Sequence, residues 1–171
     1  MKIAICITGQ KGRLHLDHLQ ESVLEVNARS ASPLKLDLFI FLQTGATIFN
    51  TIGSTKSDSR LGIMSNMELE KEINRTWGQV PHVEVKEVKF PHPIELHEFT
   101  KMMNQEKLID IFNHFKGNTT IKTLNMYKHH ERCADSILEK EASSNVKYDY
   151  VINTREDVYF FRLPVSLNGL I

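Results

Sequence analysis

Two continuous apolar runs near the start of the chain predict buried strands. Residues 2–8 form the first run, which Gly9 ends, and residues 36–42 form the second. Runs of this kind are typical of strands that are covered on both faces of a sheet. Between them a helix is predicted over about residues 13–29. Its apolar residues recur at helical spacing: Leu14, Leu19, Val23 and Val26.

A second helix and a third strand are predicted in the middle of the chain. Ser65 is a candidate N-cap for a helix that ends near Trp77, and Glu68 completes a capping box. Alternating valines from Val83 indicate a strand, although the alternation slips once near Glu87. The stretch of about 43–62 has little periodicity and is predicted to be a long functional or mobile loop.

The last part of the chain adds two helices and a strand. The helices are predicted over about 95–115 and 119–142, and the strand over about 147–154, with 158–161 as its candidate continuation. Strands that alternate with helices in this way predict an α/β fold with a mostly parallel central sheet and helices on both faces, a Rossmann-like three-layer sandwich.

Composition narrows the class of protein. The 171 residues are predicted to form a single domain, 1–171. Lysine plus arginine equals aspartate plus glutamate, at 21 each, so no overall charge recruits nucleic acid. No segment reaches the roughly 20 apolar residues that a membrane helix needs. The first apolar run is too short for a signal-peptide core, and cytoplasmic localisation is therefore expected.

The two cysteines fall within apolar patterns. Cys6 lies in the first strand, and Cys133 lies in the last predicted helix. We expect both to be buried thiols rather than a disulfide framework, as in a reducing compartment.

Polar segments follow three of the predicted strands. In a parallel sheet their carboxyl ends meet at one edge, where open α/β sheets bind ligands. The three segments are Thr8-Gly9-Gln10, Gln43-Thr44-Gly45 and Arg155-Glu156-Asp157. We expect them to form a nucleotide and metal pocket, provided that the strand order brings them together.

The charged tip at 155–157 allows two interpretations. It is either a surface turn in which Arg155 pairs with a carboxylate, or a site for a hard cation and a diphosphate. Magnesium and manganese favour one or two carboxylates plus phosphate oxygens, so Asp157, with or without Glu156, would suffice. Asp149 lies at the opposite end of the strand and is expected to be structural.

The turn after the first strand and the histidines are further candidates. Gly9 to Arg13 is either a phosphate-binding turn, to which Lys11 or Arg13 adds charge, or a plain tight turn with solvated cations. His15 and His18 have the spacing of two zinc ligands, but surface or partly buried imidazoles are favoured. The adjacent His129 and His130 lie on the last predicted helix and are likewise expected to be surface or partly buried imidazoles.

Three segments resemble the nucleotide-sugar-binding half of GT-A-type glycosyltransferases. Ile3 to Gln10 is similar to the first strand and turn of such proteins, and Leu36 to Ile40 is similar to the second strand. The third segment is the helix with Tyr127, Lys128, Cys133 and Glu141, which leads into Tyr148 to Asp157.

The resemblance implies a GT-A fold and the transfer of a sugar from a nucleotide-diphosphate donor to an acceptor. It places Asp157 as the ligand of a divalent cation, manganese or magnesium, and Thr8, Gly9 and Gln10 along the nucleotide. Arg155 stands where the Asp-x-Asp motif has its first aspartate, so it is a second candidate for neutralising the diphosphate. Glu156 is a candidate base. A noncatalytic α/β binding module and a nucleotidyl- or phosphotransferase are the alternatives.

Overall fold

A computed structural model describes residues 1–44, 61, 63–93 and 118–155, with side chains from 124 onward in the last range. The strands are β1 (Lys2–Gln10), β2 (Lys35–Gln43), β3 (Val83–Lys89) and β4 (Tyr150–Arg155). The helical segments are η1 (Lys11–Arg13), α1 (Leu16–Leu19), η2 (Gln20–Leu24), α2 (Glu25–Ala28), α4 (Asn66–Trp77) and α7 (Asn118–Ser144).

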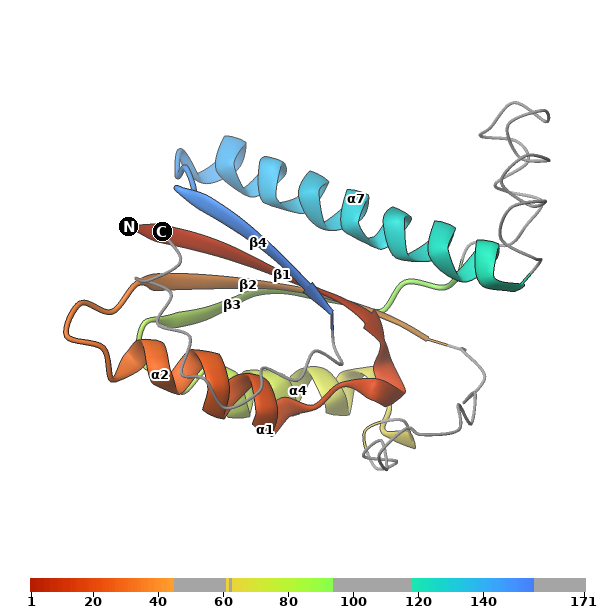
Figure 1. Ribbon diagram of the computed structural model, residues 1–171, viewed down its shortest axis with the longest axis horizontal. Coiled ribbons are helices and arrows are strands. Elements are labelled where there is room, and N and C mark those ends of the chain that lie inside the picture. Colours follow the sequence, from red (N-terminus) through yellow and green to blue (C-terminus); the bar gives the residue numbers. More distant parts are fainter. Residues whose placement is uncertain (45–60, 62, 94–117, 156–171) are drawn as a thin grey trace.

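The described strands form one parallel sheet in the order β3-β2-β1-β4. Helix α7 covers one face, and α1, α2 and α4 cover the other (Figure 1). The prediction of an α/β fold with a mostly parallel sheet and helices on both faces is therefore confirmed. The helix predicted over 95–115, the strand continuation over 158–161 and most of the loop over 43–62 lie outside the described residues.

Side chains of the central strands alternate between two cores. Ile3, Ile5 and Ile7 of β1 belong to the larger core, under α1, η2 and α4. Ala4 and Cys6 belong to a smaller core under α7. The division follows from strand geometry, because successive side chains point to opposite faces of a sheet. Even-numbered positions of β1 thus face α7.

Local signals in the sequence explain several element boundaries. The Ser65 side chain accepts a hydrogen bond from the backbone of Glu68, whose carboxylate accepts one from the backbone of Ser65, so the predicted capping box is confirmed. The predicted slip in β3 is also real: the β2–β3 register shifts between Leu38 and Phe39, where Glu87 instead of Lys86 follows Val85 as partner.

Other boundaries differ from the predictions. The first helix begins at Leu16 instead of Arg13, because residues 11–13 form the separate turn η1. Within this helix, residues 20–24 form a π-helical turn. Strand β4 begins at Tyr150, three residues later than predicted, and reaches Arg155. Asp149 just before it is structural, as expected: its carboxylate accepts a hydrogen bond of 2.7 Å from the backbone N–H of Lys2.

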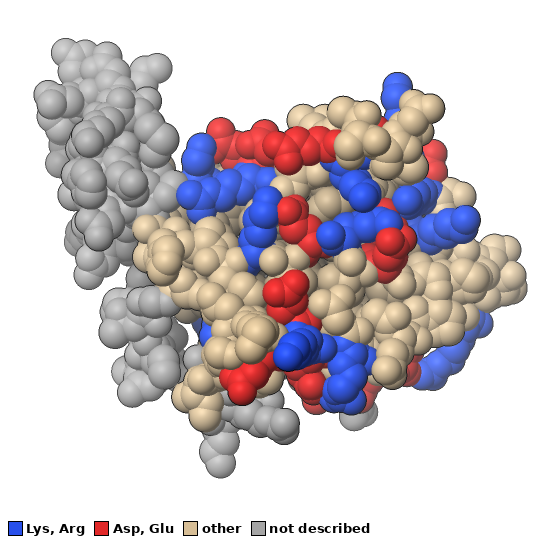
Figure 2. All heavy atoms as spheres, turned by 180° about the vertical axis from the view of Figure 1, so that it is seen from behind, with Lys and Arg blue, Asp and Glu red and all other residues tan. Residues whose placement is uncertain are grey.

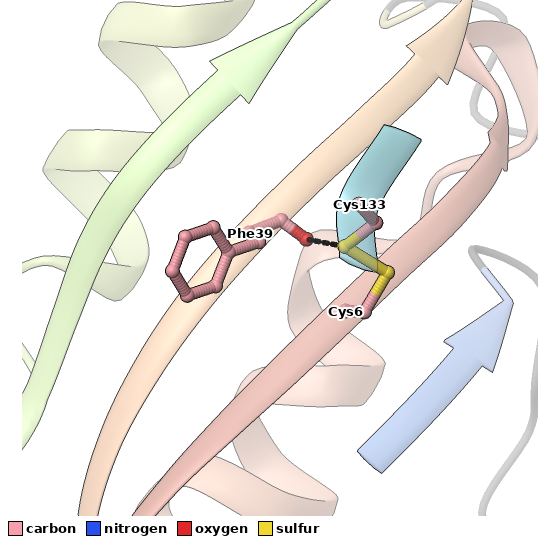
Figure 3. The surroundings of a disulfide bond; sticks show 3 residues. All are labelled: Cys6, Phe39 and Cys133. Atoms are coloured by element: carbon pink, nitrogen blue, oxygen red, sulfur yellow. Dashed lines mark hydrogen bonds between the residues drawn. A yellow bond between two sulfur atoms is a disulfide. The ribbon is translucent and has the colours of Figure 1, made fainter. Parts of the chain in front are cut away.

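The prediction of two free thiols is wrong. Cys6 and Cys133 form a disulfide that joins β1 to α7, and both residues are fully buried (Figure 3). The Cys133 sulfur lies 4.0 Å from the carbonyl oxygen of Phe39. This is a van der Waals contact, because a disulfide sulfur carries no proton to donate. The bridge adds a covalent link to the smaller core.

Candidate functional site

The strand order creates a topological switch point between β1 and β4. From β1 the chain adds β2 and then β3 on one side, and it later adds β4 on the other side of β1. In open α/β sheets, ligands bind at such a point, outside the carboxyl ends of the two strands. In this chain those ends are Gln10 of β1 and Arg155 of β4.

The described parts of all three predicted site segments meet at this edge. Thr8 is the register partner of Arg155 across the β1–β4 ladder. Gly9 and Gln10 continue β1 beyond this pair and align with Leu42 and Gln43 of β2. The structure therefore brings together the substrate-binding candidates Thr8, Gly9, Gln10 and Arg155. Glu156 and Asp157 lie outside the described residues.

Gly9 has a backbone conformation that favours glycine. Its φ of 149° lies in the region that side chains with a Cβ rarely adopt. The residue keeps its pairing with Leu42 of β2 in this conformation. The sequence signal of a glycine at the end of an apolar run is explained by this backbone requirement.

The turn that follows β1 is held by its own lysine. Lys11 Nζ donates to the carbonyl oxygen of Met64 and, at 3.1 Å, to Oδ1 of Asn66. Its ammonium group also lies 5.9 Å from the centre of the Phe90 ring. Lys11 therefore anchors the segment before α4. Arg13 closes the turn η1 on the way to α1, and α1 lies on the sheet face opposite α7.

The carboxyl edge is bordered on its other side by the histidines of α7. His129 is 2% exposed, and its Nε2 lies 3.4 Å from Oε1 of Gln43 at the end of β2. A hydrogen bond to the amide oxygen, which only accepts, requires the tautomer with the proton on Nε2 and a lone pair on Nδ1. Burial, followed by the charges of Arg132 and His130, lowers the pKa of His129 to about 4.

His130 faces the β4 side of the same helix. It is partly buried, and burial together with the positive charge of Arg155 holds its pKa below the usual range. The helical repeat supports this position, because residues eleven apart lie on the same face of an α-helix. Glu141, eleven residues later on α7, accepts a hydrogen bond of 2.8 Å from the backbone of Tyr148 just before β4. His130 and Arg155 therefore lie on the same side of the site.

Polar atoms without hydrogen-bond partners gather around this edge. Among the described residues, six buried side-chain atoms lack a partner, and all but that of Thr76 are near the edge or on α7. These five are Thr8 Oγ1, Thr44 Oγ1, His129 Nδ1, His130 Nδ1 and Arg132 Nη1. A buried polar group without a partner costs about 1–3 kcal/mol. Such a concentration is typical of a site that is completed by a ligand or ordered water.

A groove lies beside this edge, between α7 and the end of β3. It has a volume of about 440 Å³. Its lining residues are aromatic, charged or small: Phe41, Lys89, Phe90, Pro91, Arg132, Asp135, Ser136 and Glu139. The ammonium of Lys89 lies 5.6 Å from the centre of the Phe41 ring. Arg132 belongs both to this groove and to the surroundings of His129.

His15 and His18 lie on the other face of the sheet. Their rings meet edge to face, with centroids 5.6 Å apart, beside a cavity of about 290 Å³. Within the described ranges, no three His, Cys, Asp or Glu side chains are grouped as metal ligands. The predicted metal ligand Asp157 is not among the residues searched.

The expectation of surface or partly buried imidazoles is confirmed for His130, which is partly buried, and is wrong for His129, which is 2% exposed. One signal could have identified His129: it precedes Cys133 by four residues, so both share the helix face that packs on the sheet. Its contact with Gln43, 86 residues away, is tertiary and has no local signal.

Charges on the molecular surface are mixed. On the face opposite the view of Figure 1, lysine and arginine side chains are interspersed with aspartate and glutamate side chains (Figure 2). In the parts of the chain that the structure describes, no helix is long and apolar enough to cross a membrane.

Searches of protein families, of curated proteins and of solved structures find no match to this chain. The arrangement of the site is therefore the basis for any functional conclusion.

Proposed function

We propose that this chain binds a nucleotide-diphosphate sugar at the carboxyl edge of its sheet and takes part in glycosyl transfer. The observation that carries the proposal is the pairing of Thr8 with Arg155 on the two strands that flank the switch point. A hydroxyl group and a guanidinium group are both common partners of phosphate oxygens.

The proposed chemistry is charge stabilisation on the departing diphosphate. When the bond between the anomeric carbon and the diphosphate breaks, negative charge grows on the phosphate oxygens. A fixed cation at that position lowers the barrier, because it is already oriented before the reaction. Arg155 is the described residue that can supply this charge, and Gly9 permits close approach of the backbone to the ligand.

A divalent cation, manganese or magnesium, would add Lewis-acid stabilisation of the same oxygens when bound. Asp157 is the proposed ligand by resemblance to the Asp-x-Asp motif, and Glu156 is the proposed base for the acceptor hydroxyl. Both assignments rest on the sequence. Arg155, which precedes them directly, is held by register beside Thr8.

The test is calorimetric titration with UDP-glucose and GDP-mannose, each with and without manganese. We expect at least one nucleotide sugar to bind, and Asp157→Ala to remove the part of the affinity that depends on manganese. Failure of every nucleotide sugar to bind, with or without the ion, would reject the proposal. Binding without release of the free nucleoside diphosphate in the presence of any sugar acceptor would indicate a noncatalytic binding module instead.

A further inference from the structure

The carboxyl edge offers two places for a diphosphate, one on each face of the sheet. One is the turn after β1, which leads to α1. The other is the space between the ends of β1 and β4 and the histidines of α7. The choice between the two places rests on the proposed function. The described contacts favour the α7 side.

The turn after β1 has little to offer a phosphate. The ammonium of Lys11 is bound to Met64 and Asn66, so its charge serves to hold the turn. The helical run that follows spans residues 16–28 without a break, and its first turn carries the carboxylate of Asp17. A carboxylate at the N-terminus of a helix disfavours a second anion there.

The α7 side combines positive charge with unsatisfied hydrogen-bonding groups. Thr8 is 1% exposed, and its side chain faces α7, because Thr8 follows Ala4 and Cys6 in the alternation of β1. Arg155 faces the same side as its register partner Thr8, and its charge reaches the imidazole of His130. Thr8 Oγ1 and His130 Nδ1 both lack a hydrogen-bond partner.

We infer that the diphosphate binds on the α7 face of this edge, between the guanidinium of Arg155 and the imidazole of His130, and accepts a hydrogen bond from the hydroxyl of Thr8. This arrangement gives the two groups that lack a hydrogen-bond partner, Thr8 Oγ1 and His130 Nδ1, a ligand of suitable chemistry. It also assigns to α7, which carries no recognisable phosphate-binding motif, a direct part in ligand binding.

Binding at this place should be coupled to uptake of a proton by His130. Without ligand, burial and Arg155 keep the pKa of His130 low, so the ring is neutral near pH 7. A diphosphate placed between the two groups reverses the sign of the local field and raises that pKa. Affinity should therefore increase as the pH falls from about 8 to about 6.

The other groups near His130 in the described structure do not titrate over this range. His129, its neighbour on α7, has a pKa of about 4 and stays neutral. The charged groups around it are the guanidinium groups of Arg155 on β4 and Arg132 on α7. Thr8 of β1 and Gln43 of β2 carry no ionisable group. A pH dependence between 6 and 8 would thus report on His130.

The experiment measures UDP-glucose binding to the whole chain by calorimetry, in the presence of EDTA and at pH 6 and 8. Each titration is made in two buffers of different ionisation enthalpy, which gives the number of protons taken up. The diphosphate of UDP-glucose does not itself titrate in this range, so proton uptake reports on the protein.

We expect Arg155→Gln to weaken binding by about 10- to 100-fold, as for the loss of a charged hydrogen bond. His130→Gln should weaken binding about 10-fold at pH 6, have little effect at pH 8 and abolish proton uptake. The matched control is Arg75→Gln, which removes the same charge from an exposed ion pair on α4 and should change nothing.

Three results separate the inference from the function on which it rests. If UDP-glucose binds but neither Arg155→Gln nor His130→Gln weakens it, the position on the α7 face is wrong and the proposed function survives. If Arg13→Gln alone weakens binding, the phosphates lie at the turn after β1. If no nucleotide sugar binds with or without manganese, the proposed function fails as well.

Discussion

Tyr148 donates a hydrogen bond of 2.7 Å from its hydroxyl group to Oδ2 of Asp37, across the sheet edge opposite the proposed ligand site. Asp37 is only 2% exposed, and the same oxygen lies 2.9 Å from the ammonium of Lys2 and 3.8 Å from that of Lys86. Burial and the nearby carboxylate raise the pKa of Tyr148 above its usual range. The pair joins the segment before β4 to β2.

Removing the two partners should have unequal effects on stability. We expect Tyr148→Phe to lower the free energy of unfolding by about 1 kcal/mol, because Asp37 keeps its lysines. Asp37→Ala should cost about 3 kcal/mol or more, since it leaves two cations without their shared carboxylate. Urea unfolding of both variants measures the difference. Equal losses would contradict a shared role of Asp37.

Reduction of the disulfide should loosen α7 more than any other described helix. The core under α7 is small, and beyond the bridge its buried members are Ala4, Phe39, Phe41 and Ile137. Replacing both Cys6 and Cys133 by serine should cost about 2–5 kcal/mol. Hydrogen exchange should then rise in α7 while α4, with Leu69, Ile73 and Trp77 in the larger core, stays protected.

A uniform rise in exchange over both helices would show that the bridge stabilises the whole domain cooperatively. Replacement of Ser136 by alanine is a suitable comparison, because Ser136 is also buried on α7 but is not part of the disulfide. The single change Ser136→Ala should leave the exchange pattern of α7 close to that of the wild type.

Acid should destabilise the fold through His129. Its pKa is about 4 in the folded chain and 6.5 ordinarily, so the unfolded chain binds the proton first. The contribution of the neutral, buried ring to stability is fully present above pH 6.5 and is lost as the pH falls from there toward 4, with a total of about 3 kcal/mol. His129→Gln should flatten this part of the stability profile, which urea unfolding at several pH values measures.

The exposed His92 provides the control for this titration. His92→Gln removes an imidazole without touching the site and should leave the slope between pH 6.5 and 4 unchanged. If the dependence of stability on pH flattened equally in both variants, the acid sensitivity would not depend on the burial of His129.

Loss of the capping box should weaken α4. In Ser65→Ala the backbone N–H of Glu68 loses its acceptor, which we expect to cost about 1 kcal/mol in thermal or urea unfolding. Ser144→Ala near the end of α7 is the matched change, because its hydroxyl donates to the already bonded carbonyl of Lys140. A loss as large for Ser144→Ala would show that the effect is not specific to capping.

Elements with strong local signals were predictable from the sequence. Strands β1 and β2 are continuous apolar runs, and the start of α4 follows from Ser65 and Glu68. The break in the alternation of apolar residues near Glu87 also predicted the position of the register shift between β2 and β3. In each case the structure depends on residues that are close together in the chain. Residue propensities and the spacing of apolar residues are therefore sufficient to predict it.

Features that depend on contacts between distant segments were not predictable. The disulfide pairs residues 127 positions apart, and each cysteine alone is indistinguishable from a buried apolar residue. The contact of His129 with Gln43 depends on how α7 packs on β2. By contrast, the meeting of Thr8 and Arg155 was inferred from the general geometry of parallel sheets, and the strand order confirms it.

The bridge between Cys6 and Cys133 has a practical consequence for handling the protein. It encloses nearly three quarters of the sequence in a covalent ring, which includes β2, α4 and β3. A protease that cuts a single peptide bond anywhere inside the ring produces two fragments that stay attached. Such nicked molecules run as one species on a non-reducing gel and separate only after thiol treatment, so purity should be judged under both conditions.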